Sequence, residues 1–147
     1  MVSKNLSQPV RIAILSLAVC GLIFPLFITG VAQLLFPNQA NGSITKLNGR
    51  EVGSNLIAQN FSSPMFFHPR PSNDSASGVD PDITVQDAYS QVQTISSATN
   101  ITVDILKNLV DQNVQRTMWI AGDEYVNVLN LNILLIQRYS SIYNAYG

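Results

Sequence analysis

The sequence predicts an α+β protein in which one N-terminal transmembrane helix is followed by a small domain. Three observations carry this prediction. Residues 12–36 form an uncharged apolar run, which is long enough for one membrane span. An Asn-Gly pair then separates two extended runs, and strand-like alternation returns near residue 125. Between them, apolar residues recur at helical spacing over residues 85–95 and 103–110.

The composition allows one ordinary domain in addition to the membrane segment. The chain has 147 residues, of which 46% are apolar and 12% charged, and the apolar excess lies mainly in the N-terminal run. The net charge is -1 and the basic residues are scattered singly, so nucleic-acid binding is not expected. The sole cysteine, Cys20, lies in the apolar run. The domain therefore has no thiol for a disulfide or a cysteine-based metal site.

The apolar run is predicted to span the membrane once, with the N-terminus inside. As an α-helix, residues 12–36 would reach about 37 Å, against a hydrocarbon core of about 30 Å. Lys4 and Arg11 precede the run, whereas the next basic residue is Lys46, so the positive-inside rule gives the orientation. We therefore predict a cytoplasmic tail at residues 1–11, a transmembrane helix at 12–36 and an extracytoplasmic α+β domain at 37–147. The protein would be a single-pass component of the cell membrane, in contact with membrane lipid.

Two other interpretations compete with an uncleaved anchor. Gly30-Val31-Ala32 resembles a signal-peptide cleavage site, but signal h-regions have only about 7–15 apolar residues. The residues before Cys20 loosely resemble a lipoprotein box, although Val19 is a poor residue there and the apolar run continues well beyond the cysteine.

Two features of the run concern its geometry and packing. Pro25 cannot donate a hydrogen bond and its ring presses on the carbonyl of Gly21, which predicts a kink. Ala13, Ser16 and Cys20, together with Gly21, form a small-residue surface that would let another helix approach closely. Small residues are also common in spans without a partner, and the pattern favours neither interpretation.

The domain is predicted to begin with a hairpin and a proline-containing segment. Residues 43–47 and the run from Glu51 flank Asn48-Gly49, a pair typical of two-residue hairpin turns. Residues 65–72 contain two prolines, which exclude a helix and favour an extended or looped path.

Two amphipathic helices and a strand–helix pair are predicted to follow. Thr84 and Asp87 resemble a capping box before a helix with Val85, Ala88, Val92 and Ile95 on one face, and Asn100 separates it from a second helix at residues 102–114. Residues 125–129 alternate like a strand. The terminal helix is predicted from the spacing of Leu131, Leu134, Leu135, Arg138 and Ile142. It is too short to be a second span.

The sequence offers little catalytic chemistry. It contains neither a GxxxxGK[ST] nor a GxGxxG loop. His68 is the only histidine, and we expect it to pack or hydrogen-bond rather than to act in catalysis. The acidic residues Asp74, Asp80, Asp82 and Asp87 lack the central glycine and closing glutamate of an EF-hand. Turns and helix caps explain them better than a metal site, so no catalytic or metal-binding residue is predicted.

Five ordered blocks resemble one known family. They are Phe24-Pro25-Leu26 with Gln33 and the run from Phe36 to Ser43; Gly53-Ser54-x-Leu56-Ile57-x-Gln59-x-Phe61; Phe67-His68-x-Arg70-Pro71-Ser72; Ser75-x-Ser77-Gly78-Val79-Asp80-Pro81-x-Ile83; and Val126-Asn127-Val128-Leu129-x-Leu131-Asn132. In this order, over nearly the whole chain, they resemble the C subunit of the Kdp-type potassium-transporting ATPase.

The resemblance implies a non-catalytic accessory subunit of an ATP-driven, high-affinity potassium uptake complex. Its implied partners are a P-type ATPase subunit and a channel-like potassium-binding subunit, over which the outer domain is placed. ATP, Mg and potassium would act at those partners, and this chain would have no cofactor of its own. The resemblance also implies a catalytic chaperone that stabilises assembly and raises the ATP affinity of the pump subunit. The matching residues that would bind partners are Gln59, Phe61, Phe67, His68, Arg70, Pro71, Ser72, Ser77, Gly78 and Asp80.

The chain departs from the family pattern in two places. Ser75 follows Ser72 almost at once, where family members usually carry a longer stretch, so a helical insert is missing. Gln91-Val92 is followed by Gln93-Thr94 instead of the family's Gln-Val-x-Arg, and a charge contact made by that arginine is not expected here.

The block from Phe67 to Ser72 is predicted to dock on a partner rather than to fill the core of the domain. Its prolines favour an exposed path, and an arginine beside aromatic residues is typical of interface anchors. Two other functions remain open. One is a signal-anchored, outer-surface binding domain for a small ligand or cell-wall component, and the other is an outer-surface hydrolase that would have only His68 as its base.

The predicted topology can be tested by labelling single cysteines, Ser3→Cys and Ser97→Cys, in a Cys20→Ser background. An impermeant thiol reagent added to intact cells is expected to label position 97 and to spare position 3, because only the domain would face outward. Labelling in lysed cells provides the control for reactivity. The reverse pattern in intact cells would show that the orientation is wrong.

Overall fold

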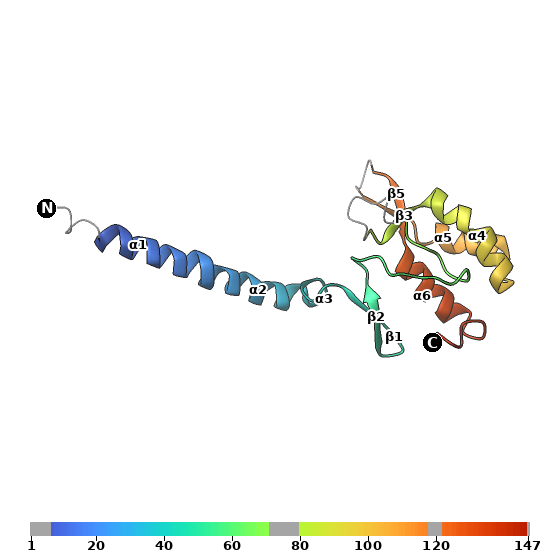
Figure 1. Cartoon of the computed structure of the whole chain (residues 1–147), viewed down its shortest axis with the longest axis horizontal. Coiled ribbons are helices and arrows are strands. Elements are labelled where there is room, and N and C mark those ends of the chain that lie inside the picture. Colours follow the sequence, from blue (N-terminus) through green and yellow to red (C-terminus); the bar gives the residue numbers. More distant parts are fainter. Residues whose placement is uncertain (1–6, 71–79, 118–121, 147) are drawn as a thin grey trace. The chain divides into compact units, whose positions relative to one another are not determined.

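The computed structural model describes residues 7–70, 80–117 and 122–146. The chain divides into two compact units, Met1–Gly42 and Ser43–Gly147, which are considered separately. The first unit is helical, and the second combines a hairpin, a three-stranded sheet and the helices packed around it (Figure 1). This is the predicted α+β class, with one N-terminal apolar helix.

The first unit is a long apolar helix. α1 (Ser7–Ala18) continues through a π turn, η1 (Val19–Ile23), into α2 (Phe24–Leu35). Its 28 residues from Gln8 to Leu35 are long and apolar enough to cross a membrane. The helix begins before residue 12 and includes Arg11, because arginine is a good helix former even where it limits an apolar run.

The π turn lies directly before Pro25. The N–H of Phe24 donates to the carbonyl of Val19, five residues earlier. Pro25 itself has no N–H, and a wider turn is one way in which a helix accommodates a missing donor. The turn includes Gly21, the residue at which the sequence predicts distortion. The regular α-helix is therefore interrupted at the predicted place, in the form of a π turn.

The helix ends in a short, hydrogen-bonded connection. α3 (Pro37–Ala40) follows Phe36. The side-chain amides of Gln33 and Asn41 exchange two hydrogen bonds of 3.1 Å, and Asn41 Nδ2 also donates to the Pro37 carbonyl at 2.6 Å. These contacts fix the chain path from the end of α2 to the end of the first unit.

The second unit begins with the predicted hairpin. β1 (Ile44–Leu47) pairs antiparallel with β2 (Arg50–Ser54). Asn48 and Gly49 both have positive φ, 50° and 82°, as a type I′ turn requires. The hairpin forms a two-stranded sheet of its own.

The helices after residue 80 follow the sequence pattern closely, whereas two of the three strands of the sheet in this region are not predicted from the sequence. β3 (Asp82–Thr84), β5 (Glu124–Asn127) and β4 (Gln115–Arg116) form an antiparallel sheet in the order β3-β5-β4. Thr84 caps α4 (Val85–Thr99) by accepting from the Asp87 N–H, and Asn100 ends it with φ 59°. α5 (Val103–Asp111) buries Leu106, Leu109 and Val110. The predicted cap, break and inward faces are confirmed, although α5 ends before residue 114.

The final strand and helix meet earlier than predicted. β5 ends at Asn127 and α6 (Val128–Arg138) begins at the next residue, so residues 128 and 129 are helical. The reason is a cap: Asn127 Oδ1 accepts from the Asn130 N–H at 3.2 Å. Its Nδ2 donates to the Asn55 carbonyl and to Asp82 Oδ1, at 3.1 and 2.9 Å. Ile142, predicted in this helix, lies beyond its end.

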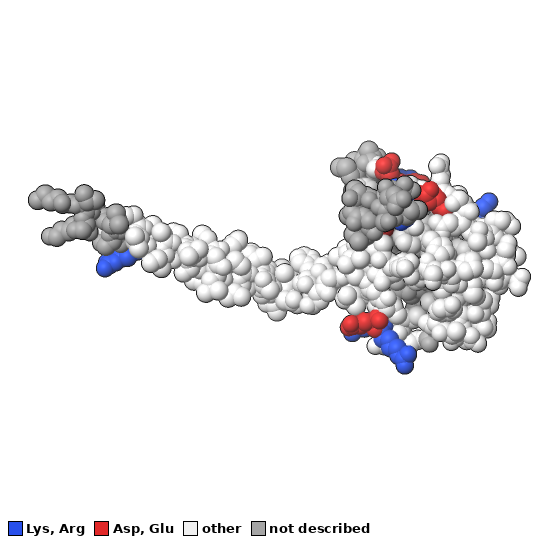
Figure 2. Space-filling view, in the orientation of Figure 1, with Lys and Arg blue, Asp and Glu red and all other residues white. Residues whose placement is uncertain are grey.

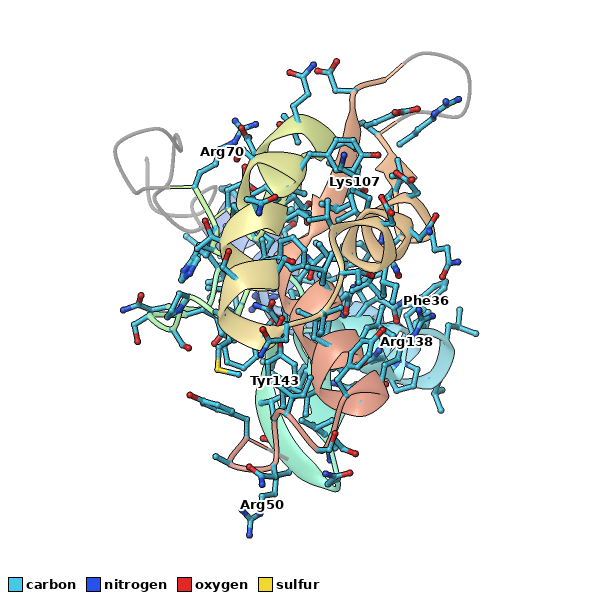
Figure 3. The ribbon with its side chains drawn as sticks, turned by 90° about the vertical axis from the view of Figure 1, so that its right-hand side faces the viewer. Phe36, Arg50, Arg70, Lys107, Arg138 and Tyr143 are labelled. Carbon is cyan, nitrogen blue, oxygen red and sulfur yellow. The ribbon has the colours of Figure 1, made fainter. Side chains whose placement is uncertain are left out.

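The core of the domain lies between α4, α5, α6 and the sheet. It also contains Phe66 and Phe67, from a segment without regular secondary structure, and Tyr143, which follows α6. Figure 3 shows Tyr143 beside α6. Its hydroxyl donates to the Met65 carbonyl at 2.8 Å. This hydrogen bond connects the chain after α6 with the segment that carries Phe66 and Phe67.

Two side-chain amides hold the irregular segment in place. Asn132 on α6 is 1% exposed, and its Oδ1 accepts from the Phe67 N–H at 2.8 Å while its Nδ2 donates to the Phe67 carbonyl at 2.9 Å. Gln91 on α4 makes the same pair of bonds to His68, at 2.7 and 3.1 Å. Two consecutive residues are therefore bound by helices on either side, and we call these contacts the Asn132 and Gln91 clamps.

The two clamps are expected to differ in their effect on stability. Asn132→Ala should lower the free energy of unfolding by about 2–4 kcal/mol, because both backbone groups of Phe67 would stay buried without a partner. Gln91→Ala should cost about 1 kcal/mol, since His68 is half-buried and water can replace part of the amide. Urea unfolding of residues 43–147 measures both. Gln93→Ala, at an exposed position of α4, is the control, and an equal loss for Asn132→Ala and Gln93→Ala would contradict the clamp.

Tyr143 is expected to make the domain sensitive to alkali. Burial raises the pKa of its phenol from 10.0 to about 12. Between these pH values the unfolded chain has lost this proton and the folded chain retains it, so stability should fall as the pH rises through that window. Tyr143→Phe should be less stable near neutral pH, because the Met65 carbonyl loses its donor, but its melting temperature should fall less steeply between pH 10 and about 12. Parallel slopes for the two proteins would contradict this account. Tyr146→Phe, which removes a more exposed hydroxyl, is the control.

Candidate functional site

The residues predicted to bind partners centre on residues 59–70, the clamped segment. It connects the hairpin with the part of the domain after residue 80 and has no helix or strand of its own. The Asn132 and Gln91 clamps fix its path. Of the predicted residues, Gln59, Phe61, Phe67, His68 and Arg70 lie in this segment. Asp80 lies elsewhere, and Pro71, Ser72, Ser77 and Gly78 lie outside the residues that the structure describes.

Phe67 is a core residue and not a docking anchor. Its side chain is 0% exposed and belongs to the main hydrophobic cluster. The prediction that its block avoids the core is therefore wrong at this position. It failed because the Asn132 clamp supplies partners for the Phe67 backbone, which allows an extended chain to pass through the interior without a strand neighbour.

His68 has a structural role in the clamped segment. Its Nδ1 lies 2.5 Å from the Phe61 carbonyl, and a carbonyl can only accept, so Nδ1 carries the proton and donates. Its own backbone is bound by Gln91. The ring thus closes the segment on itself between residues 61 and 68, in agreement with the expectation of packing and hydrogen bonding.

Arg70 reaches the surface and remains the strongest docking candidate of the block. Its Nε donates to Asp87 Oδ2 at 3.3 Å, and both side chains are partly exposed. An exposed pair of this kind contributes about 0–1 kcal/mol to stability, so the guanidinium is held in position without being needed for folding. Figure 3 places Arg70 at the end of the domain opposite Arg50.

Gln59 and Asp80 act locally in the described structure. The Gln59 side chain packs on Gly53, where an added Cβ would lie 2.8 Å from Gln59 Cδ, so a larger residue at position 53 would displace this flexible side chain. Asp80 is exposed and its Oδ1 accepts from the Asp82 N–H at 3.0 Å, which is a turn contact. Asp87 accepts from Arg70 at the start of α4. The Asp80 contact agrees with the predicted turn role, whereas the Asp87 contact is an ion pair and Asp74 lies outside the described residues.

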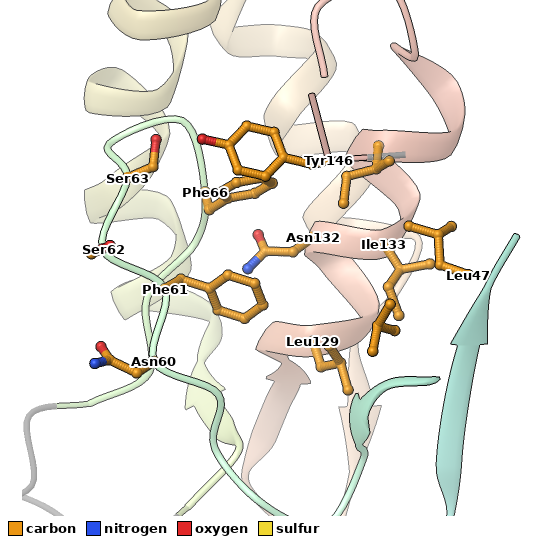
Figure 4. Close-up of a pocket in the computed structure, with 12 residues that line it drawn as sticks. Leu47, Asn60, Phe61, Ser62, Ser63, Phe66, Leu129, Asn132, Ile133 and Tyr146 are labelled. Carbon is orange, nitrogen blue, oxygen red and sulfur yellow. The ribbon is translucent and has the colours of Figure 1, made fainter. Parts of the chain in front are cut away.

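An apolar pocket lies beside the clamped segment (Figure 4). Its volume is about 270 Å³. Phe61 and Phe66 form one wall, Leu129 and Ile133 of α6 another, and Leu47 of the hairpin a third, with Asn60, Ser62 and Ser63 at the polar edge. Tyr146 stacks edge-to-face on Phe66, with ring centroids 5.0 Å apart. The pocket has the size and lining of a site for an apolar side chain or small apolar ligand.

A second, more polar pocket of about 340 Å³ lies beside β3 and β5. It is lined by Arg70, Asp80, Asp82, Ile83, Thr84, Thr117, Asp123, Glu124 and Tyr125. Burial is the main cause that raises the pKa of the Asp82 carboxyl above 3.8, and the hydrogen bond from Asn127 acts in the opposite direction. Among the described residues, no group of three or more His, Cys, Asp or Glu side chains is arranged to hold a metal ion.

The small residues predicted for helix packing all lie along the exposed helix of the first unit. Ala13 and Ser16 are in α1, Cys20 and Gly21 are in the π turn, and Pro25 is the second residue of α2. A Cβ added to Gly21 would lie 3.6 Å from Leu17 Cδ1, an ordinary contact. The helix itself therefore does not require this glycine, and its role in packing against another helix stays a prediction.

Three side-chain amides organise the site, and the sequence motifs do not predict this role. Asn127, Asn132 and Gln91 bind the backbone or side chains of other elements, whereas in the sequence they stand out only as parts of family-like motifs. A signal did exist. Asn132 stands on the inward face of an otherwise apolar helix, and a polar residue in that position needs a buried partner.

The family model and the similar proteins all indicate the same family. The family model described as K+-transporting ATPase, c chain, matches residues 6–75 and 73–137. The potassium-transporting ATPase KdpC subunit of Staphylococcus haemolyticus is 31% identical over 183 residues, with 90% of this chain and 98% of that protein covered. The corresponding subunit of Acidobacterium capsulatum is 32% identical over 183 residues, with 92% and 100% covered.

A third relative leads to the same family. The KdpC subunit of Bacillus cereus is 34% identical over 181 residues, with 88% of this chain and 94% of that protein covered. These alignments are longer than the 147 residues of the chain, so the relatives contain residues that it lacks. The family match divides at residues 73–75, where the sequence predicts the missing insert. The chain belongs to the KdpC family, the c chain of the K+-transporting ATPase.

Proposed function

We propose that the chain is the non-catalytic accessory subunit of an ATP-driven potassium uptake complex. The observation that carries this proposal is the extent of the family match, which includes both the apolar helix and the domain. A binding domain joined to an unrelated membrane anchor would match the family model only in the residues after the helix. The relatives are named as subunits of a potassium-transporting ATPase, and a subunit of this size depends on partners for transport.

The proposed partners are a P-type ATPase subunit and a channel-like potassium-binding subunit. The helix from Gln8 to Leu35 would anchor the chain, with its N-terminus in the cytoplasm and the domain outside. Lys4 and Arg11 before the helix, and no basic residue after it until Lys46, support this orientation. ATP, Mg and potassium would then bind to the partners.

Hydrolysis is assigned to the pump subunit and not to this chain. His68, the single candidate base, uses Nδ1 to bind the Phe61 carbonyl and its backbone to bind Gln91. Both interactions hold the clamped segment. A side chain that maintains the fold in this way is poorly placed to shuttle protons.

An effect on ATP affinity would have to pass through the complex. With the domain outside, nucleotide bound on the cytoplasmic side lies across the membrane from residues 43–147. Direct contact is therefore excluded, and the effect would be a coupling free energy of about 1–3 kcal/mol that favours one conformation of the pump. Arg70, held at the surface by Asp87, is the residue of the clamped segment best placed to contact a partner.

An outer-surface binding domain for a small ligand is the alternative. The apolar pocket of about 270 Å³ is the observation in its favour. A ligand role would leave the family match in the helix unexplained, and for that reason we rank it second. A pocket of this kind is equally suited to a partner's apolar side chain.

The coupling proposal predicts different results for the isolated domain and for the assembled complex. Calorimetry should detect no ATP binding by residues 43–147. Loss of the chain from the purified complex should raise the ATP concentration for half-maximal hydrolysis by about 5–150-fold, the range that corresponds to a coupling of about 1–3 kcal/mol. A complex that carries Gln93→Ala is the matched control.

The prediction for the isolated domain and the prediction for the complex can fail separately. Tight ATP binding by the isolated domain would exclude the coupling account and the proposed orientation. An unchanged ATP dependence in an intact complex that lacks only residues 44–147 would restrict the chain to assembly. Failure of the chain to co-purify with a P-type ATPase would contradict the proposed function itself.

A further inference from the structure

The turn at residues 55–57 exposes two neighbouring aliphatic side chains. It follows β2 directly, and Leu56 and Ile57 are 60% and 49% exposed. Polar residues and glycine are usual at such turns. Adjacent exposed aliphatic residues on a small domain indicate a contact surface.

Asn55 fixes this turn at three points. Its N–H donates to the Ser43 carbonyl at 3.1 Å. Its Oδ1 accepts from Thr45 Oγ1 at 2.9 Å, and its carbonyl accepts from Asn127 Nδ2 at 3.1 Å. The turn is therefore rigidly attached both to the base of the hairpin and to the start of α6.

The backbone donors of the two aliphatic residues are satisfied within the turn. The Leu56 N–H donates to Ser54 Oγ at 3.1 Å, and the Ile57 N–H donates to the Ser54 carbonyl at 3.3 Å. A segment with satisfied N–H groups can enter an apolar environment at low cost, whereas each unsatisfied group would cost several kcal/mol there. The turn thus presents side chains, and not unpaired donors, to its surroundings.

Chain connectivity sets an upper limit on the distance between the turn and the end of the apolar helix. Leu35 is the last residue of the candidate span. The chain from Leu35 to Ser43 would reach about 29 Å even if it were fully extended. Part of this connection is α3, where the rise of about 1.5 Å per residue shortens the reach to roughly 20 Å. Because Asn55 is bonded to Ser43, the turn stays within about this distance of the span.

The charge distribution favours a membrane surface on the hairpin side of the domain. Residues 43–57 carry Lys46 and Arg50 against Glu51, whereas residues 58–147 carry four basic against eight acidic residues. On the face of the domain that Figure 2 shows, most acidic side chains lie at the end away from the hairpin. An anionic lipid surface attracts the first group and repels the second.

We propose that turn 55–57 inserts the side chains of Leu56 and Ile57 into the lipid interface next to the anchoring helix. The depth would be about 5–10 Å, as for other interfacial apolar groups. Two aliphatic residues without an aromatic or arginine anchor suit lipid better than a protein hot spot. This contact would give the domain a second attachment to the membrane and restrict its rotation about the connection. The proposal rests on the membrane anchoring described under the proposed function.

The test uses the full chain in nanodiscs of phosphatidylcholine and anionic phosphatidylglycerol. A fluorophore is attached to Ile57→Cys in a Cys20→Ser background, and its emission is compared between ordinary and brominated phosphatidylcholine. Quenching of at least about twofold is expected at position 57, in keeping with burial at the acyl boundary. Ser97→Cys, on the exposed side of α4, is the matched control and should not be quenched. If Ile57→Cys fails to fold by circular dichroism, Leu56→Cys replaces it.

Native Cys20, labelled in the unaltered chain, reports on the anchor separately. Quenching at Cys20 without quenching at position 57 would refute the turn contact and leave the anchoring intact. No quenching at either position would refute both. Shielding of position 57 only after partner subunits are added would assign the turn to a protein interface, and would also overturn the proposal.

Discussion

Two hydrogen bonds between the Asn132 side chain and the backbone of Phe67 are the contact on which the interior of the domain depends. They replace the strand neighbour that an extended segment would otherwise need, so Phe66 and Phe67 can enter the core from a segment without secondary structure. Tyr143 then closes over Met65, and Gln91 fixes the next residue from α4. Removal of the Asn132 clamp would weaken each of these contacts, because all of them require the segment to lie against both α4 and α6.

The clamps also explain how a short family member can keep the fold. They bind residues 67 and 68, and the sheet resumes at Asp82, so a change in length between these points falls outside both clamps. The family match divides within that interval. The hydrogen bonds of both clamps involve no residue of that interval, and neither does the lining of the apolar pocket. The family match includes the sequence on both sides of the shortened region.

Much of the local structure could be predicted from the sequence, because local signals decide it. The apolar run, the Asn48-Gly49 turn, the Thr84 cap and the Asn100 break depend on neighbouring residues alone, and all four are confirmed. The position of Phe67 could not be predicted, because it depends on Asn132 on a distant helix. The same holds for Asn127, whose cap moves the start of α6 to residue 128. Arg70 reaches the surface as predicted, but two of its neighbours in the motif lie in the undescribed region.

The sequence separation of the central contacts has a consequence for synthesis. Asn55 meets Asn127 across 72 residues, Phe67 meets Asn132 across 65, and Met65 meets Tyr143 across 78. The hairpin and the clamped segment are therefore made first but cannot be secured until almost the entire domain has emerged. In the meantime Phe66 and Phe67 are uncovered, and loop closure over such distances slows folding. During membrane insertion, this interval is when proteases and holding chaperones can act on the nascent chain.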